Sequence, residues 1–178
     1  MIITLSGDPG AGKSTCAKGL AAAFSLTYYS TGDWMRQIAK KRGLTLEELS
    51  VIAETDPSID HGLDERQIML GKTENQFIMD GRLSAHFIPH AIKIFLTANL
   101  KERAKRVFSA RRALEFCKTE QEMEALLVKR QQSEVKRYIA WYHFNPYELK
   151  GYDYIFDSTH KLKDAIISEM IKSLQEMK

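Results

Sequence analysis

The chain has 178 residues, of which 44% are hydrophobic and 28% charged, and its formal net charge is +3 at pH 7. This size and composition are typical of one soluble domain with one hydrophobic core, and so small a net charge does not indicate a nucleic-acid or membrane-surface partner. Two cysteines are too few for a disulfide framework, and no apolar stretch has the length of a secretion signal or a membrane span. We therefore expect a single cytoplasmic domain that binds neither membranes nor nucleic acids. A monomer is the expected state, although no feature of the sequence fixes it.

The amino-terminal segment carries the strongest functional signal. The apolar run 2–5 predicts a short buried strand, and the eight residues at 7–14, GDPGAGKS, match the pattern G-x-x-x-x-G-K-[ST] at every fixed position. Glycines in this pattern let backbone N–H groups approach phosphate oxygens closely. Lys13 would reach the β- and γ-phosphates and Ser14 would hold Mg²⁺, at the positive end of the helix that follows. The segment predicts a P-loop that binds a nucleoside triphosphate.

Strands and helices are predicted to alternate along the rest of the chain. Short apolar or β-branched segments predict further strands at 26–30, 76–80, 91–96 and 154–156. Apolar residues at helical spacing predict helices along 17–24, 34–43, 45–55, 59–72 and 162–174. We expect Thr31 or Asp33 to cap the second of these helices and residues 157–159 to cap the last. Residues 100–143 are predicted to be helical, with a polar interruption near 110–119.

This alternation predicts an α/β fold. Strands joined through helices form right-handed crossovers, and the resulting parallel sheet is covered on both faces. We predict a three-layer P-loop NTPase fold with a five-stranded parallel sheet. Ligands bind such sheets beyond the carboxyl ends of the strands, where the P-loop, Asp33 and residues 80–82 are expected to meet.

Positive charge is concentrated between Lys101 and Arg137, where eleven Lys or Arg stand against six Glu. In this segment Arg103 and Arg106 share a helix face, and a second stripe is formed by Arg130, Glu134 and Arg137 at positions i, i+4 and i+7. Spacing alone leaves two interpretations of the second stripe: a solvated ladder of salt bridges or a functional surface that faces an anion.

The choice of phosphoryl acceptor depends on bases and cations. An alcohol needs a carboxylate to take its proton, and Asp33 is a candidate for that role. A phosphate needs no base, but it needs cations to offset the repulsion between two anions. Arg36, Arg82 and the later arginines fit the second requirement better, because a guanidinium binds two phosphate oxygens at once. We therefore favour a phosphate acceptor.

The sequence resembles the cytidylate kinase family of nucleoside monophosphate kinases, in particular its short archaeal form. The similarity runs essentially end to end. It is carried by the segments 2–15, 30–36, 60–67, 80–84, 130–138 and 152–159. The P-loop is shared with a very large superfamily, whereas the Arg, Glu and Arg at 130, 134 and 137 are more specific, because the family keeps this spacing near the ribose and phosphate of the acceptor.

The resemblance implies that ATP and Mg²⁺ phosphorylate CMP or dCMP, and also UMP, to the diphosphate. The ATP-binding residues would be Gly7, Asp8, Pro9, Gly10, Ala11, Gly12, Lys13, Ser14, Thr15 and Thr159, the last near adenine. The metal would be held by Ser14 and, through a water, by Asp80. The monophosphate would be bound by Thr31, Asp33, Arg36, Arg82, Arg130, Glu134 and Arg137. The catalytic residues would be Lys13, Arg106, Arg111, Arg130 and Arg137, with Arg112 as an alternative to Arg111.

The same resemblance divides the single domain, 1–178, into three parts. The core would comprise 1–30, 76–100 and 150–178, a monophosphate-binding segment would span about 31–75, and a lid would span about 106–130. Two other functions remain open. One is a small-molecule hydroxyl kinase of the shikimate-kinase type, with Asp33 as base and Arg82 on a substrate carboxylate. The other is a nucleotide-switched module that docks on RNA or a ribosomal particle through residues 101–137.

Overall fold

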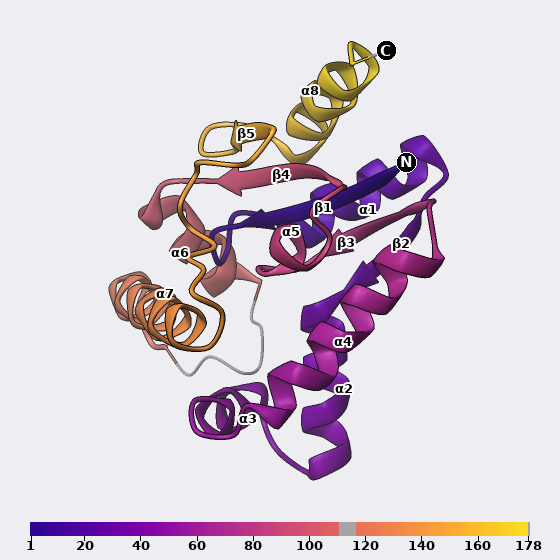
Figure 1. The fold of residues 1–178 in the computed structure, drawn as a ribbon. Helices are drawn as coiled ribbons and strands as arrows, with labels where there is room; N and C mark the ends of the chain where they lie inside the picture. The colour runs from indigo at the N-terminus through magenta and orange to yellow at the C-terminus, as the bar shows by residue number, and fades with distance from the viewer. Residues whose placement is uncertain (111–116, 178) are drawn as a thin grey trace.

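A computed structural model of the chain describes residues 1–110 and 117–177 (Figure 1). Its centre is a five-stranded sheet in the order β2-β3-β1-β4-β5, in which every neighbouring pair is parallel. The strands are β1 (Ile2–Gly7), β2 (Thr27–Ser30), β3 (Phe77–Asp80), β4 (Ile92–Thr97) and β5 (Tyr154–Asp157). The predicted α/β fold with a five-stranded parallel sheet is confirmed, and each predicted strand is present.

Helices connect the strands. They are α1 (Lys13–Phe24), α2 (Thr31–Arg42), α3 (Leu46–Ala53), α4 (Ser58–Thr73), α5 (Ser84–Phe87), α6 (Leu100–Ser109), α7 (Glu120–Tyr142) and α8 (Lys163–Gln175). The predicted helices along the chain are confirmed, including α6 and α7 within 100–143. Of the interruption predicted near 110–119, residues 111–116 lie outside the described residues. The short α5, which follows the turn after β3, was not predicted, because a single helical turn leaves no periodic signal.

The two faces of the sheet are covered by different helices. On one face α1 and α8 pack together over Ile3, Leu5, Ile78 and Ile94, all fully buried. On the other face Phe77 and Met79 of β3 join a second core with side chains of α2, α4 and the α5 segment. Successive residues of a strand point to opposite faces, so β3 contributes to both cores, as a central strand with four buried residues must.

Two further cores hold the helices at the carboxyl end of the sheet. One lies among α2, α3 and α4, and the other joins α6 to α7. In Figure 1, α3 and α7 lie on the same side of the molecule, below the ends of the strands. They also touch, since the Arg137 guanidinium of α7 donates to the Ser50 carbonyl of α3 at 3.4 Å. The helices therefore enclose the rim of the sheet where the P-loop lies.

Two predicted helix caps are wrong. Ser30, rather than Thr31 or Asp33, caps α2 by accepting a hydrogen bond from the Asp33 N–H at 3.2 Å, because Ser30 is still extended and the helix begins at the next residue. Residues 157–159 do not cap α8, which begins at Lys163 without a side-chain cap. The Thr159 hydroxyl instead accepts from the Asn99 N–H at 2.9 Å, which joins the loop after β5 to the start of α6.

Across residues 1–110 and 117–177, no helix combines the length and the apolarity that a transmembrane helix requires.

Candidate active site

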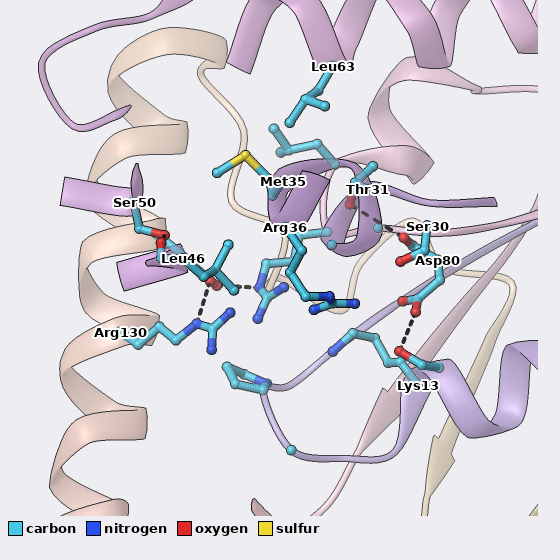
Figure 2. A pocket seen from close by; sticks show the side chains of 18 of the residues that line it. Lys13, Ser30, Thr31, Met35, Arg36, Leu46, Ser50, Leu63, Asp80 and Arg130 are labelled. Carbon is cyan, nitrogen blue, oxygen red and sulfur yellow. Dashed lines mark hydrogen bonds and ion pairs between the residues drawn. The ribbon is translucent and has the colours of Figure 1, made fainter. Parts of the chain in front are cut away.

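A cavity of about 370 Å³ lies at the carboxyl end of the sheet. Its walls come from the P-loop, the turn after β3, and helices α2, α3, α4, α6 and α7. The volume falls in the range of small-molecule sites, and the location is the one expected for ligands of a parallel sheet. Figure 2 shows Lys13, Arg36 and Arg130 around one part of the cavity and Met35 and Leu63 around another. One end is therefore cationic and the other more apolar.

The P-loop leaves β1 through glycines in unusual conformations. Gly10 and Gly12 have φ angles of 84° and 98°, which glycine adopts without strain. At Gly7 a Cβ would lie 2.1 Å from the Leu96 carbonyl oxygen, so the loop fits against β4 only without a side chain. The Lys13 ammonium donates to the carbonyls of Gly7 and Asp8, each at 2.8 Å. The loop thus holds Lys13 beside the backbone that precedes α1.

The protonation state of Lys13 is sensitive to a nearby anion. Burial, together with the nearby Arg82 guanidinium, lowers the pKa of Lys13 to about 7. An anion bound beside Lys13 would favour the charged ammonium and raise that pKa again. The site is thus prepared for a negative ligand.

Ser14 and Asp80 form a pair suited to a hard cation. The Ser14 hydroxyl donates to the Asp80 carboxylate at 2.7 Å, and the Tyr28 hydroxyl donates to the same oxygen at 3.2 Å. One hydroxyl and one buried carboxylate fit Mg²⁺, which keeps several waters and binds with substrate phosphates rather than in a cage of protein ligands. Among the described residues, His, Cys, Asp and Glu form no cluster of three or more that could hold a metal ion.

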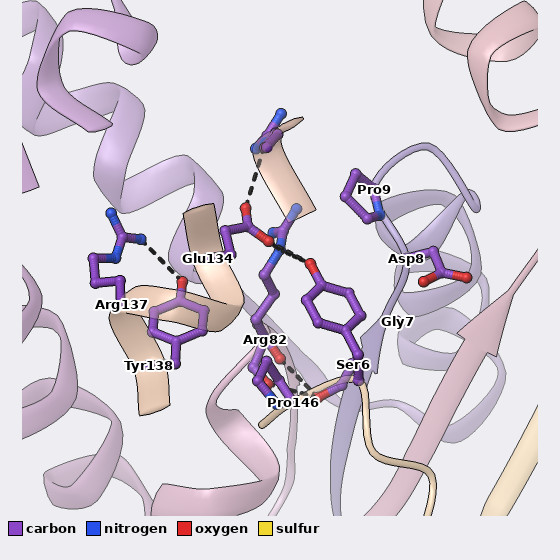
Figure 3. A network of polar contacts seen from close by, with 12 residues as sticks. Ser6, Gly7, Asp8, Pro9, Arg82, Glu134, Arg137, Tyr138 and Pro146 are labelled. Atoms are coloured by element: carbon purple, nitrogen blue, oxygen red, sulfur yellow. Dashed lines mark hydrogen bonds and ion pairs between the residues drawn. The ribbon is translucent and has the colours of Figure 1, made fainter. Parts of the chain in front are cut away.

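Glu134 lies at the centre of a polar network between α7 and the turn after β3 (Figure 3). One carboxylate oxygen forms an ion pair with the Arg82 Nε, and the other lies 3.2 Å from the Arg130 Nε. The side chain of Glu134 is only 11% exposed. Burial alone would raise its pKa, but Arg82 and Arg130 hold that pKa below its usual value, so the carboxylate stays ionised. The stripe on α7 is therefore not a solvated ladder at this position.

Arg137 is held by a second buried acid. Its Nε lies 3.2 Å from a carboxylate oxygen of Asp60 in α4, and both side chains are 9% exposed. Its terminal nitrogens donate to the Ser50 carbonyl and, at 3.2 Å, to the Tyr138 hydroxyl. Arg130, Glu134 and Arg137 all line the cavity, so the whole stripe faces it.

Only some of the site residues predicted around the start of α2 line the cavity. Thr31 and Arg36 line the cavity, and the Thr31 hydroxyl donates to the Asp80 carbonyl at 3.4 Å. Asp33 forms an ion pair with Arg36, and the side chains of both are 46% exposed. In the described part of the chain the cavity lining includes Arg36 and Arg82 but not Asp33.

Of Arg106 and Arg111, two of the predicted catalytic arginines in the lid segment, only Arg106 lies within the described residues. Arg106 lines the cavity, but its guanidinium donates to the Ser158 carbonyl at 2.7 Å and to the Ser158 hydroxyl at 3.0 Å. It also donates to the carbonyl of Thr159, which lies next to the cavity rather than in its lining. Arg111 and its alternative Arg112 lie outside the described residues.

Of the predicted ATP-binding residues, several line the cavity directly. These are Pro9, Gly10, Gly12, Lys13, Ser14 and Thr15. Asp8 instead accepts a hydrogen bond from the Thr97 hydroxyl at 2.7 Å, which anchors the loop to β4. Asp8 thus contributes to the shape of the loop.

Sequence reasoning from spacing missed the acidic residues of α4. Asp60 and Asp64 both line the cavity, one helical turn apart, and Asp64 accepts a hydrogen bond from the Tyr142 hydroxyl. The i, i+4 spacing of two acids was the available signal, but only the fold brings α4 against α7. Burial and the neighbouring Asp60 raise the pKa of Asp64 to about 6, against the opposing effects of Tyr142, His61 and Arg137.

The raised pKa of Asp64 predicts that the stability of the protein depends on pH. Because the pKa of Asp64 is higher in the folded than in the unfolded chain, ionising it costs folding free energy, and that cost grows as the pH rises from about 4 to above 6. Asp64→Asn removes the titration and keeps an oxygen that can accept from Tyr142. We expect the gain in unfolding free energy of Asp64→Asn over wild type to be about 2 kcal/mol larger at pH 7.5 than at pH 4. Urea denaturation at both pH values measures it; an offset independent of pH would contradict the assignment.

Together the P-loop, the sheet order and the cavity define the class: the chain is a P-loop kinase-like α/β protein. Shikimate kinase from Bacteroides thetaiotaomicron shares this fold with a TM-score of 0.68, covering 98% of each chain at 16% sequence identity.

The family follows from closer relatives. Residues 2–160 match the cytidylate kinase-like family. A protein named cytidylate kinase from Methanocella arvoryzae is 35% identical over 100% of this chain and 99% of its own. Another of that name from Methanococcoides burtonii is 37% identical over 97% of this chain and 95% of its own. The chain belongs to the cytidylate kinase-like family.

Proposed function

We propose that the protein transfers the γ-phosphoryl group of ATP, with Mg²⁺, to a pyrimidine nucleoside monophosphate, converting CMP or dCMP to the diphosphate. One observation carries this proposal. Lys13 and Ser14 of the P-loop line the same cavity as four arginines from three other segments of the chain. These are Arg36, Arg82, Arg130 and Arg137. A single cavity can therefore hold two phosphate groups side by side.

The donor end follows from the P-loop. Backbone N–H groups at the start of α1 and the Lys13 ammonium would neutralise the β- and γ-phosphates. Ser14 and Asp80 would hold Mg²⁺, Asp80 through a water, and the metal would supply further charge neutralisation on the transferred group. Thr159 and the loop after β5, which Arg106 ties to α6, would lie near adenine.

The acceptor end requires cations rather than a base. A monophosphate oxygen is already nucleophilic, so the chain needs to orient it and to offset repulsion between two anions. Arg36, Arg82 and Arg137 supply that charge, and Glu134 and Asp60 hold two of them in place. A hydroxyl acceptor would need a base such as Asp33. Asp33 is paired with Arg36 and is not among the described residues that line the cavity, which favours the phosphate acceptor over the shikimate-kinase alternative.

The other end of the cavity suits a nucleobase. Met35, Leu46 and Leu63 give it apolar walls, and in Figure 2 Met35 and Leu63 lie away from Lys13. Asp64 and Gln67 offer polar groups beside these walls. Apolar walls with a few polar groups are typical of sites that bind small organic molecules. In this proposal residues 31–75 form the monophosphate-binding segment. The lid would span about 106–130, of which 111–116 lie outside the described residues.

A coupled assay of ADP release tests the proposal. Purified protein is given ATP and Mg²⁺ with CMP, dCMP, UMP, AMP, GMP or shikimate as acceptor. We expect CMP or dCMP to give the highest kcat/KM. Turnover with shikimate alone would overturn the proposal. Negligible turnover with every monophosphate, together with ATP-dependent RNA binding that weakens steeply with salt, would support the docking alternative instead.

A further inference from the structure

Tyr147 is a side chain that none of the site assignments includes, although its hydroxyl lies in the polar network of the cavity. It donates a hydrogen bond to Glu134 and accepts one from the Arg82 Nε at 3.2 Å. Glu134 and Arg82 in turn form an ion pair. Three groups from α7, the turn after β3 and the loop after α7 thus meet at one point, next to the proposed phosphate site.

The turn that follows α7 places Tyr147 at this point. His143 ends α7 in a left-handed conformation with φ of 50°, and this reverses the chain toward the sheet. The Tyr147 N–H donates to the Asn145 side-chain oxygen at 3.0 Å, which fixes the turn. The Tyr147 ring packs edge-on against the buried Phe95 of β4, with ring centroids 6.5 Å apart. The ring is thereby anchored to the sheet, and the hydroxyl is held in a defined place.

The way Arg82 is held determines what it can bind. Its hydrogen bond to Tyr147 and its ion pair with Glu134 both run through Nε. The terminal nitrogens of the guanidinium are then the part of the fork that can meet two oxygens of a phosphate. Burial by itself would lower the pKa of Arg82, but the carboxylate of Glu134 outweighs this effect and raises that pKa above its usual value. The guanidinium therefore stays charged.

We propose that Tyr147 is a positioning residue, whose hydroxyl orients Arg82 and Glu134 so that the Arg82 fork faces the phosphate of the acceptor. The inference rests on the proposed function and extends it to a residue that would not touch the substrate. The sequence holds a partial signal, because Tyr147 directly follows the aromatic segment 141–146. Nothing in that segment, however, indicates that a hydroxyl reaches back to residues 82 and 134.

The test uses Tyr147→Phe and a matched control, Tyr152→Phe. Tyr152 lies in the same loop and also packs edge-on against Phe95, with centroids 5.1 Å apart, but its hydroxyl donates to the Pro146 carbonyl at 3.0 Å. Both variants lose one hydroxyl and keep a ring on the same surface. We expect Tyr147→Phe to raise the KM for CMP about tenfold, with the KM for ATP changed less than about twofold. Tyr152→Phe should leave both KM values near wild type.

A double-mutant cycle with Arg82→Lys separates positioning from general packing. If Tyr147 acts through Arg82, then Tyr147→Phe should change the KM for CMP by less than about twofold in the Arg82→Lys background. An equal effect in both backgrounds, or equal behaviour of Tyr147→Phe and Tyr152→Phe, overturns this inference while the proposed function stands. A wild-type protein that neither binds CMP in calorimetric titration nor phosphorylates it overturns both.

Discussion

Lys13→Met is expected to lower kcat for phosphorylation of CMP by about a thousandfold, because the ammonium would stabilise charge on the transferred phosphoryl group. The variant should remain folded. The pKa of Lys13 is lowered by burial and by Arg82, which means that ionising this side chain adds no net stability to the fold. Initial rates of ADP release at saturating ATP and CMP measure the effect.

Two controls accompany this substitution. The melting temperature should stay within a few degrees of wild type. Lys172→Met, in α8, removes a lysine whose side chain is 79% exposed and should not alter kcat. A Lys13→Met protein that keeps kcat within a few-fold of wild type would remove Lys13 from the reaction.

Arg137→Met is expected to lower kcat/KM for CMP by about a hundredfold, while the KM for ATP stays nearly unchanged. The substitution also leaves Asp60 buried without its partner, which costs about 3–5 kcal/mol of unfolding free energy. A loss of activity by itself could therefore reflect loss of structure. Steady-state kinetics with each substrate varied in turn, together with thermal denaturation, records both effects.

The double variant Arg137→Met with Asp60→Asn separates the two effects. Replacing the carboxylate by an amide removes the buried charge, so the double variant should recover most of the lost melting temperature. If Arg137 binds the monophosphate, the double variant should remain impaired toward CMP. If Arg137 serves only to neutralise Asp60, activity should return to the level of Asp60→Asn alone, and that outcome would contradict the assignment.

The strands, the P-loop and most helices could be predicted from sequence because their signals are local. The apolar run before Gly7, the spacing through Ser14 and the i, i+4 pattern of Arg130 and Glu134 each lie within a few residues. Spacing on α7 identified which side chains share a face. It could not determine whether that face meets solvent or a cavity, since the answer depends on Arg82.

The partners of the site residues could not be predicted, because they are distant in sequence. Asp60 meets Arg137, and Tyr147 meets Arg82, only after α4, α7 and β3 have packed together. Arg106 is a similar case, since its contacts with Ser158 arise where the loop after β5 crosses α6. Asp33 differs, because its pairing with Arg36 is an i, i+3 contact that spacing allows. It was predicted as a monophosphate ligand, and that role stays a prediction.

In the proposed reaction one cavity would hold a nucleoside triphosphate and a nucleoside monophosphate with their phosphates facing each other. Calorimetric titration with adenosine and cytidine joined through five phosphates probes this arrangement. We expect one site per chain, binding at least about a hundredfold tighter than either ATP or CMP alone, and loss of most of this gain in the Arg137→Met, Asp60→Asn variant. Binding no tighter than that of ATP, unaffected by added CMP and by the double substitution, would rule the arrangement out.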